Sequence, residues 1–254
     1  MSRILVAVPH ADELAFHCGG TIARLVGEGH DIYQVVVTTG AKSSFVRPRG
    51  EMEVIISEEA RKSAEILGLK DIFLWNSGDN LNEHDTPIIQ ERLTALARYL
   101  NIDTIFGFDP SATRDAHPDQ IIVGKASVWT AYFCAFPLHY PHQRDFGLEP
   151  CRITDQYQFA YHPEGDHLET LDISDTIEKK VEAVLAYESQ MVWCADIEID
   201  RMKRMGIPYD HIDRDNYSPA IADDVRREAT ERGASHGFAY AEIMRHISGG
   251  EVLT

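Results

Sequence analysis

The stretch VAVPHADELAFHCGGTIARL (residues 6–25) passes from an apolar run to a histidine and two acids within a few residues. The run that leads into it, ILVAV (residues 4–8), is short, aliphatic and β-branched, as in a strand buried on both faces. Beyond the acids, Ile22, Leu25 and Val26 follow helical spacing before Gly27 and Gly29. The stretch therefore predicts a buried strand, a polar loop and a helix.

The same unit recurs along the first half of the chain. Further buried strands are expected at residues 31–40, 71–75 and 103–108, and amphipathic helices at residues 52–70 and 85–101. The first of these helices has one apolar face, made of Ile56, Ala60, Ala64 and Leu67, and Gly68 ends it. Alternation at about 25–30 residues per unit indicates a right-handed α/β fold with a Rossmann-like, mostly parallel sheet flanked by helices.

The pattern changes after Phe136. A loop rich in Pro, Gly and aromatic residues is expected at residues 136–150, followed by strands at residues 152–162 and 169–174. A helix is expected at residues 175–192 with Asp175 as its N-cap. Residues 218–247 are expected to form a charged helix, a break that contains glycine and a short aromatic segment. Without a repeat or a linker, residues 1–254 are expected to form a single domain.

Composition limits the partners. The net charge of −17, from 24 basic and 41 acidic residues, argues against nucleic acid or an anionic membrane. The four cysteines form no CxxC pair, and the N-terminus lacks the apolar core of a signal peptide, so we expect a cytoplasmic setting. We expect a small-molecule substrate and leave a homo-oligomer open.

The first loop carries candidate metal chemistry. His10 and Glu13, three residues apart, could both face a divalent ion, with Asp12 free to act as a general base. The alternative is that Asp12 and Glu13 only begin a helix, where its dipole favours acids.

The loop after the fourth strand repeats the arrangement. HPDQ (residues 117–120) begins an amphipathic helix, with Pro118 suited to its first turn. Because the carboxyl ends of parallel strands share one sheet edge, we expect the two loops to meet there.

These motifs together resemble the LmbE-like, or PIG-L, family of metal-dependent N-deacetylases, whose members commonly contain AHPDDE…GCGGTIA and HPDH. Three further segments agree in family order, EEARKSAEILGL, LDISDTIEKKVEAVLAYESQM and ERGASHGFAYAE, as does the loop at residues 136–150. The resemblance covers most of the chain and implies the same fold.

The resemblance also implies residue roles. His10, Glu13 and Gln120 fall on the positions of the metal ligands, here for Zn²⁺ or another divalent ion. Asp12 falls on the general base and His117 on the residue beside the developing oxyanion. Asp119 would orient a neighbouring histidine.

Two ligand positions depart from the family. Glu13 replaces the usual Asp, and Gln120 replaces a histidine, although an amide oxygen is a poorer zinc ligand than imidazole. Three outcomes stay open: weaker zinc binding through Gln120, replacement by His17 or His162, or no metal.

Four further residues are candidates for substrate binding. Asp79 follows the third strand, where the family often carries an acid that contacts substrate hydroxyls, or it belongs to a turn. Arg47 and Arg49 could bind a carboxylate or phosphate, or only solvate their loop. His162 could reach the pocket or be structural.

The function predicted from these features is zinc-dependent removal of an N-acetyl group from an amino sugar or its conjugate. Asp12 would serve as base and His117 would stabilise the oxyanion. Two alternatives remain: hydration of an unsaturated dicarboxylic acid on the same fold, and a non-catalytic binding protein with a degraded metal site.

Overall fold

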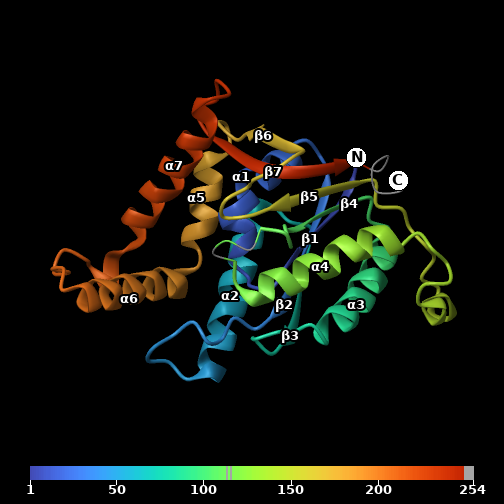
Figure 1. The fold of residues 1–254 in the computed structure, drawn as a ribbon, viewed down its shortest axis with the longest axis horizontal. Coiled ribbons are helices and arrows are strands. Elements are labelled where there is room, and N and C mark those ends of the chain that lie inside the picture. The colour runs from blue at the N-terminus through green and yellow to red at the C-terminus, as the bar shows by residue number, and fades with distance from the viewer. Residues whose placement is uncertain (113, 115, 249–254) are drawn as a thin grey trace.

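The computed structural model describes residues 1–112, 114 and 116–248, and contains one sheet of seven strands (Figure 1). The strands are β1 (Arg3–Val8), β2 (Asp31–Thr38), β3 (Asp71–Ser77), β4 (Thr104–Phe108), β5 (Asp155–Phe159), β6 (Leu168–Asp172) and β7 (Ala241–Ser248). Their order is β3-β2-β1-β4-β5-β7-β6. Strands β1 to β5 pair in parallel, and β7 is antiparallel to both its neighbours. The expected Rossmann-like, mostly parallel sheet is confirmed.

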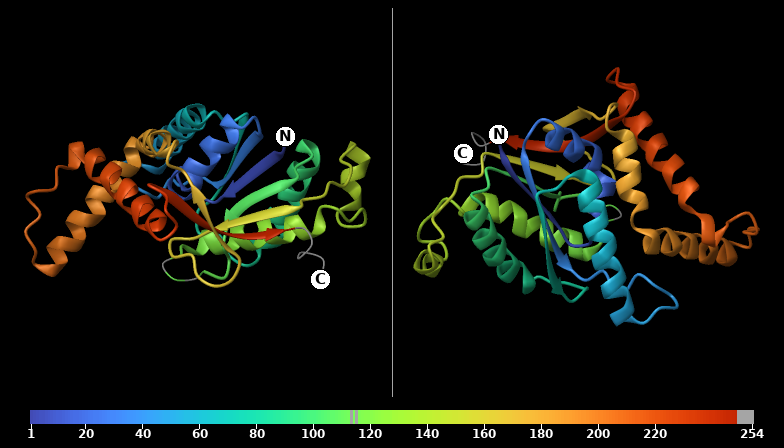
Figure 2. Two further views of the ribbon diagram at one scale, coloured as in Figure 1. Left: turned by 90° about the horizontal axis from the view of Figure 1, so that it is seen from above. Right: turned by 180° about the vertical axis from the view of Figure 1, so that it is seen from behind.

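Helices cover both faces of the sheet. They are α1 (Glu13–Gly27), α2 (Arg49–Leu67), α3 (Asp85–Leu100), α4 (Pro118–Phe133), α5 (Ile177–Leu185), α6 (Glu188–Met205) and α7 (Ser218–Ala234), with the 3₁₀ turns η1 (Pro141–Phe146) and η2 (Arg214–Asn216). One core packs α1, α2, α5 and α7 against the sheet, and a second core packs α3 and α4. Figure 2 shows α6 and α7 extending beyond the sheet on the side away from η1.

One expectation for the second half was wrong, and one strand was not predicted. The helix expected at residues 175–192 is divided into α5 and α6, and Thr176 rather than Asp175 precedes it. The division falls at Tyr187, which is 1% exposed and donates its hydroxyl proton to the carbonyl oxygen of Ala11 at 2.6 Å. The short aromatic segment expected near the C-terminal end includes a strand, β7, which lies between β5 and β6 in the sheet.

One of the two adjacent glycines of α1, Gly20, packs closely against the Ile173 side chain. A Cβ on Gly20 would lie 2.7–2.9 Å from atoms of the Ile173 side chain. The backbone N–H groups of Gly20 and Thr21 donate to the Glu242 carboxylate at 3.1 and 2.9 Å. Close packing therefore explains the glycine at this position.

Candidate active site

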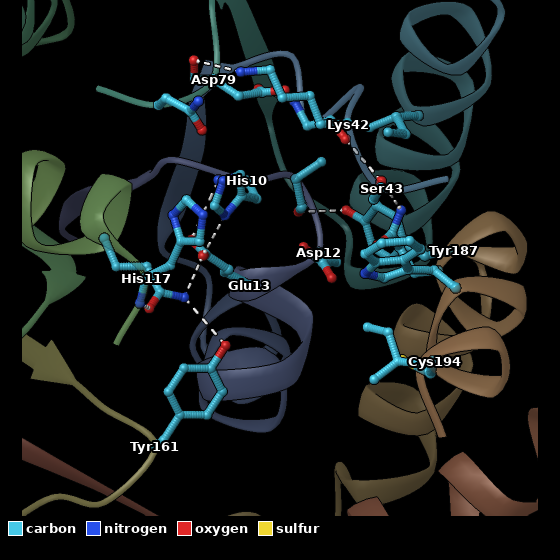
Figure 3. A pocket seen from close by; sticks show the side chains of 18 residues that line it. His10, Asp12, Glu13, Lys42, Ser43, Asp79, His117, Tyr161, Tyr187 and Cys194 are labelled. Atoms are coloured by element: carbon cyan, nitrogen blue, oxygen red, sulfur yellow. Dashed lines mark hydrogen bonds and ion pairs between the residues drawn. The ribbon is translucent and has the colours of Figure 1, made fainter. Parts of the chain in front are cut away.

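The loops after β1 and β4 lie together at the carboxyl edge of the sheet. These strands are neighbours, and the strand order reverses between them, which is where open α/β sheets bind ligands. A cavity of about 370 Å³ opens there, lined from the first loop by His10, Asp12 and Glu13 and from the second by His117 and Gln120. Figure 3 shows His10, Asp12, Glu13 and His117 gathered around one space.

Glu13 connects the two loops. Its Oε1 lies 2.9 Å from His10 Nδ1 and accepts a hydrogen bond from Gln120 Nε2 at 2.7 Å. The Gln120 Oε1 accepts from the backbone N–H of His117 at 2.7 Å, which makes a capping box at the start of α4. Gln120 therefore presents its nitrogen to Glu13, and its oxygen is used at the helix cap.

Asp119 is buried next to the His10 imidazole. It is 0% exposed, and its carboxylate accepts from the backbone N–H groups of Leu81 at 2.7 Å and Asn80 at 3.2 Å. Its Oδ2 lies 3.4 Å from His10 Nε2. Burial raises the pKa of Asp119, but hydrogen bonds from His10 and the two backbone groups outweigh this and hold the pKa below its usual value. The geometry suits the orienting role implied by the resemblance, which stays a prediction.

Asp12 is the N-terminal cap residue of α1, yet its side chain makes no capping hydrogen bond. Burial, and then the negative charge of Glu13, raise its pKa to about 6, although His10 opposes the shift. Its carboxylate lines the cavity without being used to begin the helix. Asp12 thus combines two properties of a general base: access to the cavity and increased basicity.

One group of donor atoms in the described chain could hold a metal ion. His10, His117 and Asp119 each offer an atom, and these atoms lie within 4.8 Å of one another. The rings of His10 and His117 meet edge to face with centroids 5.0 Å apart. The ligand set implied by the resemblance shares only His10 with this group. Glu13 lies within reach of the same imidazole, whereas Gln120 would have to turn its amide to offer an oxygen.

The two histidines proposed as replacement ligands lie elsewhere. His17 is buried and stacks on Phe159 at 5.3 Å, and burial, followed by the charges of Lys180 and Arg232, lowers its pKa to about 3. His162 is exposed. The cavity is lined by neither residue.

Of the candidates for substrate binding, one lines the cavity and the two arginines do not. Asp79 lines the cavity; its Oδ1 accepts from the Gly40 N–H at 2.8 Å, and its buried Oδ2 has no hydrogen-bond partner among the described residues. Arg47 and Arg49 do not line this cavity, and they pair with Glu51 and Glu53 at the start of α2.

Several lining residues were missed by the sequence analysis. They are Lys42, Ser43, Tyr161, Tyr187, Gln190, Trp193 and Cys194. Tyr161 lies beside Gln120, with its hydroxyl 3.2 Å from Nε2. The only signal for this set was the resemblance of the segment that includes Tyr187 and Gln190.

Residues 5–131 match the family model described as PIG-L, GlcNAc-PI de-N-acetylase. The chain belongs to the PIG-L family. It is similar to a protein of Thermococcus kodakarensis named diacetylchitobiose deacetylase, with 29% identity over 98% of this chain and 84% of that protein. It also resembles a probable N-acetyl-alpha-D-glucosaminyl L-malate deacetylase 2 of Bacillus cereus, with 28% identity over 50% of this chain and 59% of that protein.

Solved structures share the fold. The N,N′-diacetylchitobiose deacetylase of Pyrococcus horikoshii aligns with a TM-score of 0.80 and 24% identity, over 98% of this chain and 84% of that one. The 4-carboxy-2-hydroxymuconate hydratase GalB of Pseudomonas putida aligns with a TM-score of 0.68 and 18% identity, over 97% and 96%. No helix within the described residues has the length and apolar character that a membrane crossing requires.

Proposed function

We propose that this chain is a metal-dependent N-deacetylase that hydrolyses the acetamido group of an N-acetylated amino sugar or of its conjugate. The observation that carries the proposal is the position of Asp12. Its carboxylate makes no capping hydrogen bond to α1 and lines the cavity beside His10 and Glu13. His117 lines the same cavity from the other loop. The named activities of the relatives support the substrate class.

The donor set at His10 fits a divalent ion. His10 would hold it with Glu13, or with His117 and Asp119, because an imidazole and a carboxylate oxygen meet in either grouping. When bound, such an ion polarises the amide carbonyl and lowers the pKa of water.

The chain's own residues then move the protons and hold the substrate. Asp12 accepts a proton as the water oxygen bonds to the acyl carbon, and delivers it to the amine nitrogen as the C–N bond breaks. The half-exposed His117 donates to the developing oxyanion. The unpaired Oδ2 of Asp79 accepts a hydrogen bond from a sugar hydroxyl.

The alternative of dicarboxylate hydration rested on the altered metal-ligand positions and on Arg47 and Arg49 as residues that could bind a carboxylate. Both guanidinium groups pair with glutamates on α2, and the cavity of Asp12 is lined by neither. We therefore propose hydrolysis alone.

Product analysis tests this function. The protein is treated with a chelator, supplied with Zn²⁺, Mn²⁺ or no metal, and incubated with N,N′-diacetylchitobiose or N-acetylglucosamine. We expect equal amounts of acetate and free amine in a metal-dependent reaction, and no loss of absorbance from dienoic dicarboxylates. Absence of amine release with every metal would overturn the proposal.

A further inference from the structure

Trp193 and Ser43 line two cavities, so they form a wall that both share. One is the cavity of His10 and Asp12. The other, of about 430 Å³, lies among α2, α6 and the loop after β2. A substrate whose acetamido group reaches Asp12 therefore has room for a second unit on the far side of Trp193.

Large apolar side chains surround this wall. The Trp193 ring packs against Phe45 with centroids 4.7 Å apart, and Phe45 is 59% exposed. Ile197 lies one helical turn along α6, lines the first cavity and is 43% exposed. Of these three residues only Trp193 lines both cavities, and Phe45 lines neither. Exposed apolar surface beside polar groups is typical of ligand grooves, and a flat indole matches the C–H face of a sugar ring.

The charged residues that line the second cavity disfavour the binding of an anionic ligand. Arg214 is engaged by Asp196 through two hydrogen bonds of 2.5 and 2.9 Å, and Arg47 pairs with Glu51. The carboxylates lining this cavity, Glu59, Glu188, Asp196 and Asp215, outnumber the two arginines. A phosphate or carboxylate would meet a wall of net negative charge, whereas neutral hydroxyl groups would find acceptors.

We propose that the second cavity, with Trp193 as its apolar wall, is a second subsite, which takes a neutral glycosyl unit joined to the sugar that loses its acetyl group. The substrate is then an uncharged oligosaccharide rather than an anionic conjugate, and Trp193 determines this specificity. The inference rests on the proposed function for the identity of the first sugar.

Paired substrates and variants test the subsite. The variants are Trp193→Ala, Trp193→Phe and the control Trp129→Ala, whose indole is 42% exposed on α4 and lines neither cavity. We compare kcat/KM for N,N′-diacetylchitobiose and N-acetylglucosamine. Trp193→Ala should lower the disaccharide-to-monosaccharide ratio about tenfold, Trp193→Phe should keep most of it, and Trp129→Ala should not change it.

Binding without turnover separates the two proposals. Calorimetry on each variant combined with Asp12→Asn measures the affinity for the disaccharide, the monosaccharide and N-acetylglucosamine 1-phosphate. Loss of disaccharide affinity in Trp193→Ala supports the subsite even where no acetate is released, in which case only the proposed function fails. Equal losses for both neutral sugars, or preference for the phosphate, overturn the subsite whether or not deacetylation occurs.

Discussion

The orientation of the Gln120 amide follows from its partners. The backbone N–H of His117 requires an acceptor, and the Glu13 carboxylate requires a donor. Reversing the amide would set N–H against N–H and oxygen against carboxylate. Glutamine at this position is therefore suited to the capping box.

Replacement of this glutamine tests its place in the metal site. Gln120→His restores the residue type usual in the family and should tighten Zn²⁺ binding at least about tenfold, because imidazole is the better zinc ligand. Competition with a chromogenic chelator measures the affinity. Gln143→His, outside the cavity, controls for the added imidazole. Unchanged affinity in Gln120→His would mean that residue 120 does not face the ion.

Single residues also show where sequence reasoning stops. His10 and Asp12 follow β1, and His117 begins α4 after the loop from β4, so their meeting could be predicted from the fold. Tyr161 and Lys42 come from loops without periodicity, and their place in the cavity depends on the path of the backbone. Arg47 pairs with Glu51 and lines the second cavity rather than the cavity of Asp12, and the sequence alone could not show in which cavity it lies.

At the scale of elements, α1 depends on close contact at Gly20. Gly20→Ala would bring a Cβ to 2.8 Å from the Cβ of Ile173, so it should lower the free energy of unfolding by about 1–3 kcal/mol. The control is Gly27→Ala, where no atom lies within 4 Å of the added carbon, and it should be neutral or stabilising. Urea unfolding measures both. Equal stability of the two variants would contradict the close packing.

Strand β7 shows why an element can escape prediction. Three polar residues interrupt its apolar pattern, and each has a partner distant in sequence. Glu242 pairs with Lys180 at 2.6 Å, Arg245 with Asp109 at 3.0 Å, and His246 contacts Glu169 and Asp155 at 2.7 and 2.9 Å. Hydrophobic periodicity cannot detect a strand whose polar side chains are satisfied by tertiary contacts. The parallel strands β1 and β4, which are apolar after their first residue, were predictable.

His246 should make stability depend on pH. Burial lowers its pKa, but the hydrogen bonds and charges of Glu169 and Asp155 outweigh this and raise it. Its contribution is complete below the unfolded value of about 6.5 and disappears as the pH rises through the higher folded value. His246→Gln should therefore be more destabilising at pH 5.5 than at pH 8.5, by unfolding in urea. Glu169→Gln should weaken this dependence; a pH-independent difference would contradict the assignment.

Across the whole molecule, a buried ion pair between Lys180 and Glu242 helps to connect the first helix to the last strand. Lys180 Nζ, on α5, donates to the Phe16 carbonyl of α1 and to Glu242 of β7, both at 2.6 Å. Both charged side chains are nearly fully buried. Glu13 at the start of α1 lines the cavity, and the contacts of Lys180 and Glu242 therefore fix this helix against the last strand.

Removal of one partner should be costly. Lys180→Met should lower the free energy of unfolding by about 3–5 kcal/mol, because it leaves Glu242 buried without its counterion. The neighbouring Lys179→Met should change it by less than about 0.5 kcal/mol. The double variant Lys180→Met/Glu242→Gln should lose less than the sum of the single changes. An additive result, measured by chemical unfolding, would argue against coupling.

We propose that the loops after β1 and β4 form one hydrolytic site with Asp12 as its base. The most direct measurement is the rate of acetate release from N,N′-diacetylchitobiose by the unmodified protein, Asp12→Asn and the exposed control Asp175→Asn. We predict an unchanged rate for the control and a fall of about 10²–10⁴-fold for Asp12→Asn, with both variants folded. A rate in Asp12→Asn equal to that of the unmodified protein would contradict the account.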